Sequence, residues 1–275
     1  FLQLKDWTLM AAAAVLLSAC SLNNVNEDAS LESFFKEANA EGTFAILDNG
    51  TGEFTVYNLP RYRDSAYAPA STFKIVNSLI GLQTGVITND SMVIKWDGVQ
   101  RPFESWNKDL TMYEAFRASA VPYYQEVARR IGRDTMQRWL DSLSYGSKKI
   151  TAPIDSFWLD GSLTIKPDEQ LGLVKQLYFD QLPFYKVNQQ AVKRAMLWED
   201  TPQYRLAYKT GWAFMDSTHH QKHIGWVVGW VEENKHPYFF VLNLETADPN
   251  FDMVGVRMKM LKGILGKLGY LQGKM

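Results

Sequence analysis

The chain has 275 residues, of which 46% are hydrophobic, so it can bury a core large enough for one sizeable domain or two closely packed lobes. Its 29 basic and 30 acidic residues give a formal net charge of −1, which speaks against a nucleic-acid partner and favours a small-molecule substrate. The only cysteine is Cys20, so the folded part contains no disulfide, thiol nucleophile or thiolate metal site.

The first 20 residues have the pattern of an export signal. An uncharged apolar run from Leu9 to Leu17 follows Lys5. The run is too short for a transmembrane helix, which needs about 20 apolar residues. Residues 17–20, Leu-Ser-Ala-Cys, resemble a bacterial lipoprotein cleavage box, which implies that Cys20 is lipidated and begins the mature protein. The alternative is an ordinary signal peptide that happens to end in cysteine.

The export signal sets expectations for the location of the protein and the start of its fold. We expect an exported, periplasmic protein whose contact with a membrane is limited to a lipid on Cys20. Residues 21–30 are polar and are expected to form a tether. The folded domain is therefore expected to span residues 31–275.

Two antiparallel strands are expected at the start of the folded part, Thr43–Leu47 and Phe54–Tyr57. Between them, the Asn-Gly pair of residues 48–52 offers the positive φ angles that a tight hairpin needs. Apolar residues then recur at steps of three and four over Thr72–Leu82, which predicts a buried helix that stops at Gly85.

Helices dominate the middle of the chain and strands its last quarter. The expected helices are Met112–Arg117, Pro122–Ile131, Arg133–Leu143, Pro167–Leu177 and Asn188–Met196. The expected later elements are the strands Tyr204–Lys209, His223–Val231 and Tyr238–Leu244 and the closing helix Val254–Leu268. Early and late strands that share one sheet predict an α/β fold, an antiparallel sheet flanked by helices with an inserted helical lobe over about residues 76–203.

Ser71 and Lys74 are the first candidates for chemistry. They lie three residues apart at the start of a predicted helix, so the hydroxyl and the amine share one face. Burial among apolar neighbours disfavours the ammonium form, which lets Lys74 take the serine proton as a neutral base. The alternative, a serine cap followed by a solvated lysine, is the interpretation that we give to the other two Ser-x-x-Lys matches, Ser33–Lys36 and Ser105–Lys108.

Lys209-Thr210-Gly211 is the second candidate, at the end of the strand that begins near Tyr204. Alternation along a strand points Lys209 and Thr210 to opposite faces, and Gly211 lets a ligand approach the backbone. An edge strand of this kind can hydrogen-bond an amide substrate. The alternative is a hairpin end with an exposed lysine.

Four short motifs carry a family resemblance. They are Ser71-Thr72-Phe73-Lys74, Ser119-Ala120-Val121, Phe157-Trp158-Leu159-Asp160-Gly161 and Lys209-Thr210-Gly211. Their order and spacing resemble the class D serine β-lactamases, the oxacillinase type, over about residues 42–257. Ser-x-x-Lys and Lys-Thr-Gly also occur together in class A enzymes and penicillin-binding proteins. The resemblance implies a penicillin-binding or transpeptidase-like fold and hydrolysis of β-lactam antibiotics without a metal or a bound cofactor.

The resemblance also implies catalytic roles. Ser71 is the expected nucleophile, and Lys74 is the expected general base, carboxylated on its amine by carbon dioxide or bicarbonate. The indole N–H of Trp158 is expected to bind that carbamate, although Trp158 as a plain core aromatic remains the alternative. Ser119 is expected to relay a proton to the leaving nitrogen, beside the positive charge of Lys209.

The substrate-binding residues follow from the same resemblance. The backbone amides of Ser71 and Trp212 are the expected oxyanion donors. Thr210 and Arg257 are expected to hold the substrate carboxylate, for which an arginine fork is well suited. For Arg257, a surface arginine on the last helix is the alternative.

An apolar lid over Lys74 is expected from Val121 and Leu159. Two positions depart from the family pattern: Ser147 stands where asparagine is usual, and Val227 stands where a second tryptophan is usual. Loss of the asparagine amide is expected to loosen the loop that fixes Trp158.

Three histidines, His219, His220 and His223, form the only metal-like cluster, and a chance hairpin loop is the favoured interpretation, so no metal is expected. Two other functions remain open. One is a non-hydrolysing sensor domain that binds β-lactams, and the other is a cell-wall transpeptidase or carboxypeptidase. The substrate would in each case contact the same serine.

Overall fold

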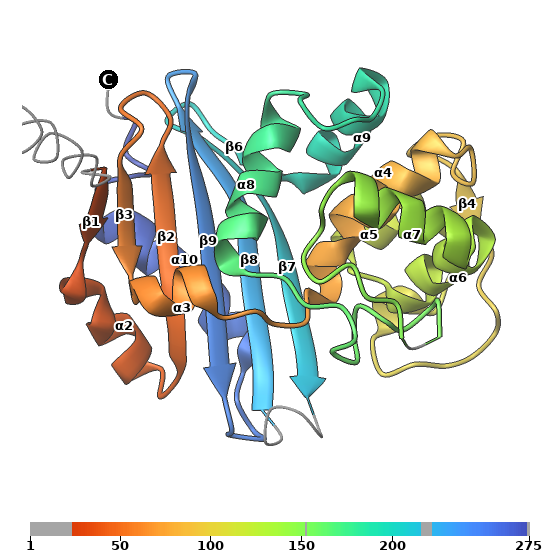
Figure 1. The fold of residues 1–275 in the computed structure, drawn as a ribbon, viewed down its shortest axis with the longest axis horizontal. Helices are drawn as coiled ribbons and strands as arrows, with labels where there is room; N and C mark the ends of the chain where they lie inside the picture. Colours follow the sequence, from red (N-terminus) through yellow and green to blue (C-terminus); the bar gives the residue numbers. More distant parts are fainter. Residues whose placement is uncertain (1–23, 152, 216–221, 274–275) are drawn as a thin grey trace, which may run out of the picture.

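The computed structural model describes residues 24–151, 153–215 and 222–273. Within these ranges a seven-stranded sheet has helices on both faces and a helical lobe beside it, on the right in Figure 1. The strands are β1 (Val25–Glu27), β2 (Glu41–Asp48), β3 (Phe54–Tyr57), β6 (Leu197–Asp200), β7 (Arg205–Met215), β8 (Lys222–Glu233) and β9 (His236–Thr246). They lie in the order β1-β3-β2-β9-β8-β7-β6.

Helices are the other main elements of the described residues. They are α2 (Glu32–Glu37), α3 (Leu59–Asp64), α4 (Lys74–Gln83), α5 (Met112–Arg117), α6 (Val121–Ile131), α7 (Arg133–Ser142), α8 (Pro167–Tyr178), α9 (Lys186–Met196) and α10 (Met253–Lys267). A two-stranded sheet of β4 (Val93–Ile94) and β5 (Leu110–Thr111) lies in the lobe. The predicted α/β fold with an inserted helical lobe is confirmed.

The early and late strands share one sheet, as predicted. β2 pairs antiparallel with both β3 and β9, so that Ala45 faces Val56 on one side and Val241 on the other. The turn between β2 and β3 differs from the prediction, because its positive φ angle falls on Gly52 (75°) rather than on the Asn-Gly pair. The Asp48 carboxylate instead accepts a hydrogen bond from the amide of Gly50 at 2.7 Å.

The predicted polar tether is wrong from Asn24 onwards. Val25–Glu27 forms β1, which pairs parallel with β3 at the edge of the sheet. The Phe54 amide donates to the Asn24 carbonyl, and the Asp28 amide donates to the Val56 carbonyl. An edge strand needs few buried side chains, so a polar sequence is compatible with one. Backbone hydrogen bonds to β3, rather than buried apolar side chains, hold the segment in place.

Two apolar layers hold the helices to the sheet. One lies between the sheet and α10 with α2, and includes Phe44, Leu244 and Leu261. The larger one lies on the opposite face and continues into the helical lobe, and includes Phe73 and Trp158. The lobe is shorter than the predicted range of about residues 76–203. Two elements inside that range belong to the sheet region instead, since α8 packs on β8 and β9 and β6 pairs with β7.

β7 is longer than the predicted strand Tyr204–Lys209. It continues to Met215, so Lys209-Thr210-Gly211 lies in its middle and not at its end. β6 pairs with only the first residues of β7, from Arg205 to Ala207. The outer edge of β7 beyond Ala207 is therefore free of a partner strand among the described residues and faces the lobe (Figure 1).

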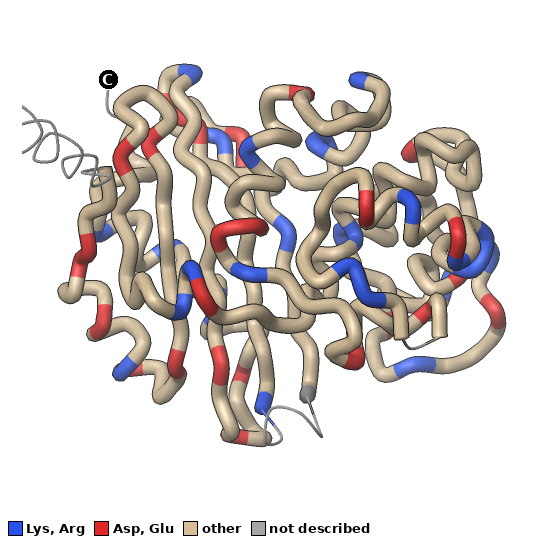
Figure 2. Tube along the Cα trace, viewed as in Figure 1, with Lys and Arg blue, Asp and Glu red and all other residues tan. Residues whose placement is uncertain are grey.

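Charged positions of both signs are interspersed along the chain trace (Figure 2), in keeping with a formal net charge of −1. In the part of the chain that the structure describes, no helix has the length and apolar character that a membrane span requires.

Candidate active site

Ser71 lies in a short 3₁₀ turn, Ala70–Phe73, that leads into α4. Two contacts hold this turn between the sheet and the lobe. The Trp226 indole on β8 donates to the Ala68 carbonyl at 2.9 Å, and the Ala70 amide donates to the Trp158 carbonyl at 3.0 Å. Ala70 has a φ of 50°, a strained conformation that such contacts must maintain.

Lys74 meets Ser71 inside the protein. Its Nζ lies 2.8 Å from the Ser71 Oγ, and its side chain is fully buried. Burial lowers the pKa of Lys74 from 10.5 to about 7, so a large share of the amine is neutral at physiological pH. The sequence predicted both this proximity and the cause of the pKa shift.

The other two Ser-x-x-Lys matches have none of these properties. Lys36 is exposed and pairs with Glu32 at 2.8 Å, and Lys108 is exposed in a loop. Both were interpreted as solvated lysines, and the structure confirms this.

Ser119 faces the same site from the junction of α5 and α6. The Lys209 Nζ donates to its Oγ at 3.0 Å. Ser119 has a φ of 53°, which only the surrounding contacts can maintain. One such contact is the hydrogen bond of 2.9 Å from the Trp106 indole to the Ala118 carbonyl. Burial, followed by the charges of Lys74 and Arg257, holds the pKa of Lys209 well below its usual range.

Trp158 is fully buried against the serine turn. Its ring stacks on Phe73 with centroids 5.5 Å apart. The indole Nε1 has no hydrogen-bond partner among the described residues. A buried donor without an acceptor is unfavourable, so a water molecule or another group that accepts from it would be stabilising.

Ser147 fixes the loop that follows Trp158. Its hydroxyl accepts a hydrogen bond from the Thr164 amide at 3.1 Å, and its amide donates to the Thr164 carbonyl at 2.8 Å. A serine hydroxyl therefore makes a direct contact with this loop, although the sequence led us to expect a loosened one.

Arg257 comes from α10 and reaches β7. It is only 7% exposed, and its guanidinium donates to the Gly211 carbonyl at 2.7 Å. Burial lowers its pKa to about 10. The alternative interpretation of Arg257 as a surface residue is therefore wrong. The sequence left it open because helix periodicity does not reveal which side of α10 faces β7.

Gly211 allows β7 to pass close to the serine turn. A Cβ at this position would lie 3.0 Å from the Pro69 carbonyl oxygen and 3.2 Å from a Thr72 methyl group. These distances are shorter than ordinary van der Waals contacts, so a side chain here would have to displace the turn. The sequence analysis expected glycine here to let a ligand approach the backbone. In the structure, glycine also lets the serine turn approach it.

A cleft of about 370 Å³ runs along these residues. It is lined by Ser71, Phe103, Trp106, Arg117, Ala118, Ser119, Val121, Trp198, Tyr208, Thr210, Gly211, Trp212, Val254, Arg257 and Met258. Leu159 is partly buried in the adjoining core and is absent from this lining, so Val121 alone of the predicted lid reaches the cleft. Trp212 is 39% exposed, and its indole donates to His223 at 3.0 Å.

Among the cleft residues that the sequence analysis did not predict are Arg117, Trp198 and Tyr208, which contact one another. The Arg117 guanidinium lies 3.9 Å from the centre of the Trp198 ring, and that ring stacks on Tyr208. They come from α5, β6 and β7, and no local motif links them. The only signal available was that Arg117 lies two residues before Ser119.

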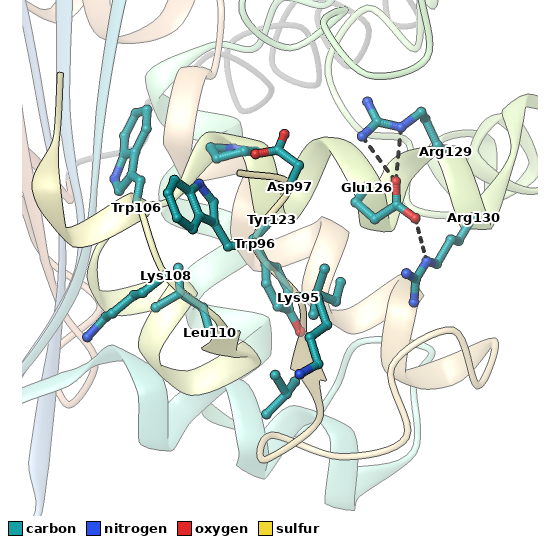
Figure 3. A pocket seen from close by; sticks show the side chains of 13 residues that line it. Lys95, Trp96, Asp97, Trp106, Lys108, Leu110, Tyr123, Glu126, Arg129 and Arg130 are labelled. Carbon is teal, nitrogen blue, oxygen red and sulfur yellow. Dashed lines mark hydrogen bonds and ion pairs between the residues drawn. The ribbon is translucent and has the colours of Figure 1, made fainter. Parts of the chain in front are cut away.

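A second pocket, of about 290 Å³, lies in the lobe and shares Trp106 with the cleft (Figure 3). In its lining, Glu126 accepts hydrogen bonds from both Arg129 and Arg130. Tyr123 supplies the only hydroxyl in its described lining, which holds no cysteine or histidine. This pocket therefore lacks a nucleophile with a base beside it, and the cleft at Ser71 is the candidate active site.

The predicted histidine cluster is tested only in part. His219 and His220 lie outside the described residues, and His223 accepts the hydrogen bond from Trp212. Among the residues that the structure describes, no group of three metal-ligating side chains comes together.

Comparison with known proteins places these features in a family context. A family model for the penicillin binding protein transpeptidase domain matches residues 42–265. The chain is 36% identical to beta-lactamase OXA-5 of Pseudomonas aeruginosa, over 93% of this chain and 98% of that protein. It is 38% identical to beta-lactamase OXA-48 of Klebsiella pneumoniae, over 87% of this chain and 88% of that protein. Regulatory protein BlaR1 of Bacillus licheniformis is 34% identical over 77% of this chain, which matches only 34% of BlaR1.

Solved structures give the same result. The class D beta-lactamase FUS-1 of Fusobacterium nucleatum superposes with a TM-score of 0.83 at 35% identity, covering 90% of this chain and 100% of that one. The C-terminal domain of the Bacillus licheniformis BlaR penicillin-receptor also gives a TM-score of 0.83, at 30% identity, covering 90% of this chain and 97% of that one. The predicted penicillin-binding or transpeptidase-like fold is confirmed.

Proposed function

This chain belongs to the class D family of serine β-lactamases, and on that premise we propose that it hydrolyses β-lactam antibiotics through an acyl-enzyme on Ser71. The observation that carries the proposal is the contact of 2.8 Å between Lys74 Nζ and Ser71 Oγ in a buried setting. Burial that favours the neutral amine gives the serine an adjacent base.

Acylation starts when Lys74 takes the proton of the Ser71 hydroxyl. The Oγ then bonds to the lactam carbonyl carbon, and the amides of Ser71 and Trp212 bind the oxyanion that develops. The ring C–N bond breaks as the nitrogen receives a proton through Ser119. Lys209, which donates to the Ser119 hydroxyl at 3.0 Å, orients this relay.

The substrate carboxylate is bound by Thr210 and Arg257. Arg257 is held by the Gly211 carbonyl, so its guanidinium is oriented before a substrate arrives. Both residues line the cleft that contains Ser71. Deacylation then requires a water molecule that is activated next to Lys74.

The surroundings of Lys74 fit a carboxylated lysine. The amine is neutral enough to react with carbon dioxide, and the unpartnered indole N–H of Trp158 lies against the same turn. When present, the carbamate supplies an anionic oxygen base for both acylation and deacylation. Trp158 would donate to it, and Val121 would limit the access of bulk water.

A β-lactam sensor is the second candidate, favoured by the likeness to BlaR1 and to the C-terminal domain of BlaR. A sensor needs the acylation step but not the deacylation step. Kinetics with a chromogenic cephalosporin separate the two functions. We expect many turnovers per molecule, with none in Ser71→Ala. A single burst equal to the protein concentration would overturn the hydrolase and favour the sensor.

We also propose that the protein is exported and is anchored by a lipid on Cys20. The supporting pattern, residues 1–20, lies outside the described residues. Expression of the full chain and of Cys20→Ser in a bacterium tests this. The native chain is expected in the membrane fraction and the variant in the soluble periplasmic fraction. Equal distribution of the two would contradict the anchor.

A further inference from the structure

The catalytic cleft carries more positive charge than one carboxylate requires. Its described lining contains two arginines, Arg117 and Arg257, and no aspartate or glutamate. The proposed function assigns Arg257 to the carboxylate on the substrate ring. Arg117 has no role in that chemistry, and no carboxylate in the described parts of the chain lies within ion-pair distance of it.

Arg117 is held rigidly at one end of the cleft. Its Nη1 donates to the Leu197 carbonyl at 2.7 Å, and its guanidinium lies 3.9 Å from the Trp198 ring centre and 5.5 Å from that of Tyr113. The carbonyl accepts from one nitrogen of the guanidinium, and none of the described residues accepts a hydrogen bond from the other nitrogens. A half-buried cation fixed in this way is prepared to bind an anion at low entropic cost.

An aromatic wall stands beside this arginine. The rings of Trp198 and Tyr208 stack with an interplanar angle of 12° and centroids 5.4 Å apart. The Trp198 indole donates to the Tyr208 carbonyl at 3.1 Å, which fixes the ring against β7. Trp198 remains 37% exposed, so part of its ring is available to a ligand. Arg117 lies over the Trp198 ring and Tyr208 stacks on it, so a planar group can meet only the part of this pair that stays exposed, while its charge meets the edge of the guanidinium.

The position of this wall along β7 indicates which part of a substrate reaches it. Three groups follow one another along β7 in steps of two residues. They are the proposed oxyanion amide of Trp212, the proposed carboxylate-binding Thr210 and the ring of Tyr208. Each step covers about 7 Å. A substrate whose lactam carbonyl lies at Trp212 and whose carboxylate lies at Thr210 thus directs its next substituent toward Tyr208. In a cephalosporin this is the substituent on the carbon adjacent to the one that bears the carboxylate.

We propose that Arg117, Trp198 and Tyr208 form a subsite for a planar, anionic substituent on that ring carbon. The preferred substrates are cephalosporins that carry an acidic heteroaromatic ring there, and so have a second negative charge. This inference rests on the proposed β-lactamase function and names a substrate class for the same cleft. Arg117 acts on substrate selection and takes no part in proton transfer.

The test uses two cephalosporins with the same amide side chain, one with an acidic heteroaromatic substituent and one with a neutral ring of similar size. We expect the native enzyme to show a kcat/KM about tenfold higher for the acidic compound, mainly through KM, because one charge-assisted hydrogen bond has this effect. Arg117→Gln should bring the ratio close to one. Arg117→Lys should restore part of it, since the charge remains and the planar fork is lost.

Arg138→Gln is the matched control, because it removes the same charge from an exposed arginine on α7. The ratio should stay at its native value in this variant. If Arg117→Gln lowers kcat equally for both compounds, Arg117 only supports the neighbouring Ser119 and the subsite is overturned. Equal kcat/KM for the two compounds in an active native enzyme also overturns it. Failure to turn over either compound would overturn the proposed function, and the subsite with it.

Discussion

The Lys209 Nζ donates a hydrogen bond to the Ser119 Oγ at 3.0 Å, and this contact joins the central sheet to the helical lobe across the cleft. Lys209 lies on β7, whereas Ser119 lies between α5 and α6. The contact involves two groups that the mechanism uses. The same pair therefore links the sheet to the lobe and would carry the proton in the proposed mechanism.

Replacement of Ser119 should separate catalysis from backbone strain. We expect Ser119→Ala and Ser119→Gly each to lower kcat by about 100-fold, because a positioned proton donor contributes at least this much. Glycine tolerates the φ of 53°, so Ser119→Gly should be about 1 kcal/mol more stable than Ser119→Ala. Steady-state kinetics and urea denaturation measure the two effects. A kcat close to native in either variant would rule out the proton relay.

Replacement of Lys74 by methionine should abolish turnover and stabilise the fold. The pKa of Lys74 is lowered from 10.5 to about 7, so the unfolded chain binds more protons than the folded one between these values. Burial of the charge therefore destabilises the native protein most at or below pH 7, and this cost declines as the pH rises toward 10.5.

We accordingly expect Lys74→Met to raise the free energy of unfolding by up to roughly 4 kcal/mol at pH 6 in bicarbonate-free buffer, with a smaller gain at pH 9. Denaturation curves at both pH values measure this. A gain that grows with pH would contradict the assignment of a depressed pKa. The exposed Lys36→Met should change stability by less than about 0.5 kcal/mol at either pH.

Trp158→Phe tests the proposed carbamate. The indole N–H has no partner among the described residues, so its removal should cost little stability while the stacked ring is kept. If the N–H binds a carbamate, the variant needs about 10- to 100-fold more bicarbonate for full activity, since a hydrogen bond to a charged group is lost. Labelled bicarbonate and carbon NMR report the carbamate directly.

Trp139→Phe, in the stacked pair with Phe184, serves as the control. An identical bicarbonate requirement in the Trp158 variant and the native enzyme would count against the assignment.

Gly211→Ala should damage the site through sterics. The added methyl group would meet Pro69, Thr72 and Trp226 at 3.0 to 3.2 Å, and two of these contacts involve backbone or the first side-chain carbon. Separation of β7 from the serine turn should lower the acylation rate and destabilise the fold by about 1–3 kcal/mol. Gly172→Ala, on α8 with open space around it, should be neutral or slightly stabilising. Similar effects in the two variants would contradict this account.

Most elements were predictable because their apolar residues follow one period. α5 matches the predicted Met112–Arg117, and the other long helices differ by one or two residues at their ends. β1 was missed because an edge strand with a polar sequence carries no alternating pattern. The length of β7 was missed because the sequence analysis placed Lys209-Thr210-Gly211 at the end of the strand, whereas the strand continues past Gly211 to Met215.

The site was predictable to the extent that its residues occur in short motifs. Ser71 and Lys74 are three residues apart on one turn, so local geometry brings them together. Arg117, Trp198 and Tyr208 come from three separate elements, and only the packing of β6 against α5 and β7 makes them neighbours. No spacing in the sequence encodes that packing.

β6 pairs with only the first residues of β7, and this also affects the solubility of the protein. Beyond Ala207, the backbone N–H and C=O groups on the outer side of β7 have no partner strand among the described residues, and these groups are what a substrate amide would use. An open edge of this kind is also a template on which a second chain can add a strand and start aggregation. The helical lobe beside that edge leaves a cleft of about 370 Å³, suited to a small molecule. We infer that the lobe protects the folded chain against edge-to-edge association, and that substitutions that detach it would cause aggregation before they cause loss of secondary structure.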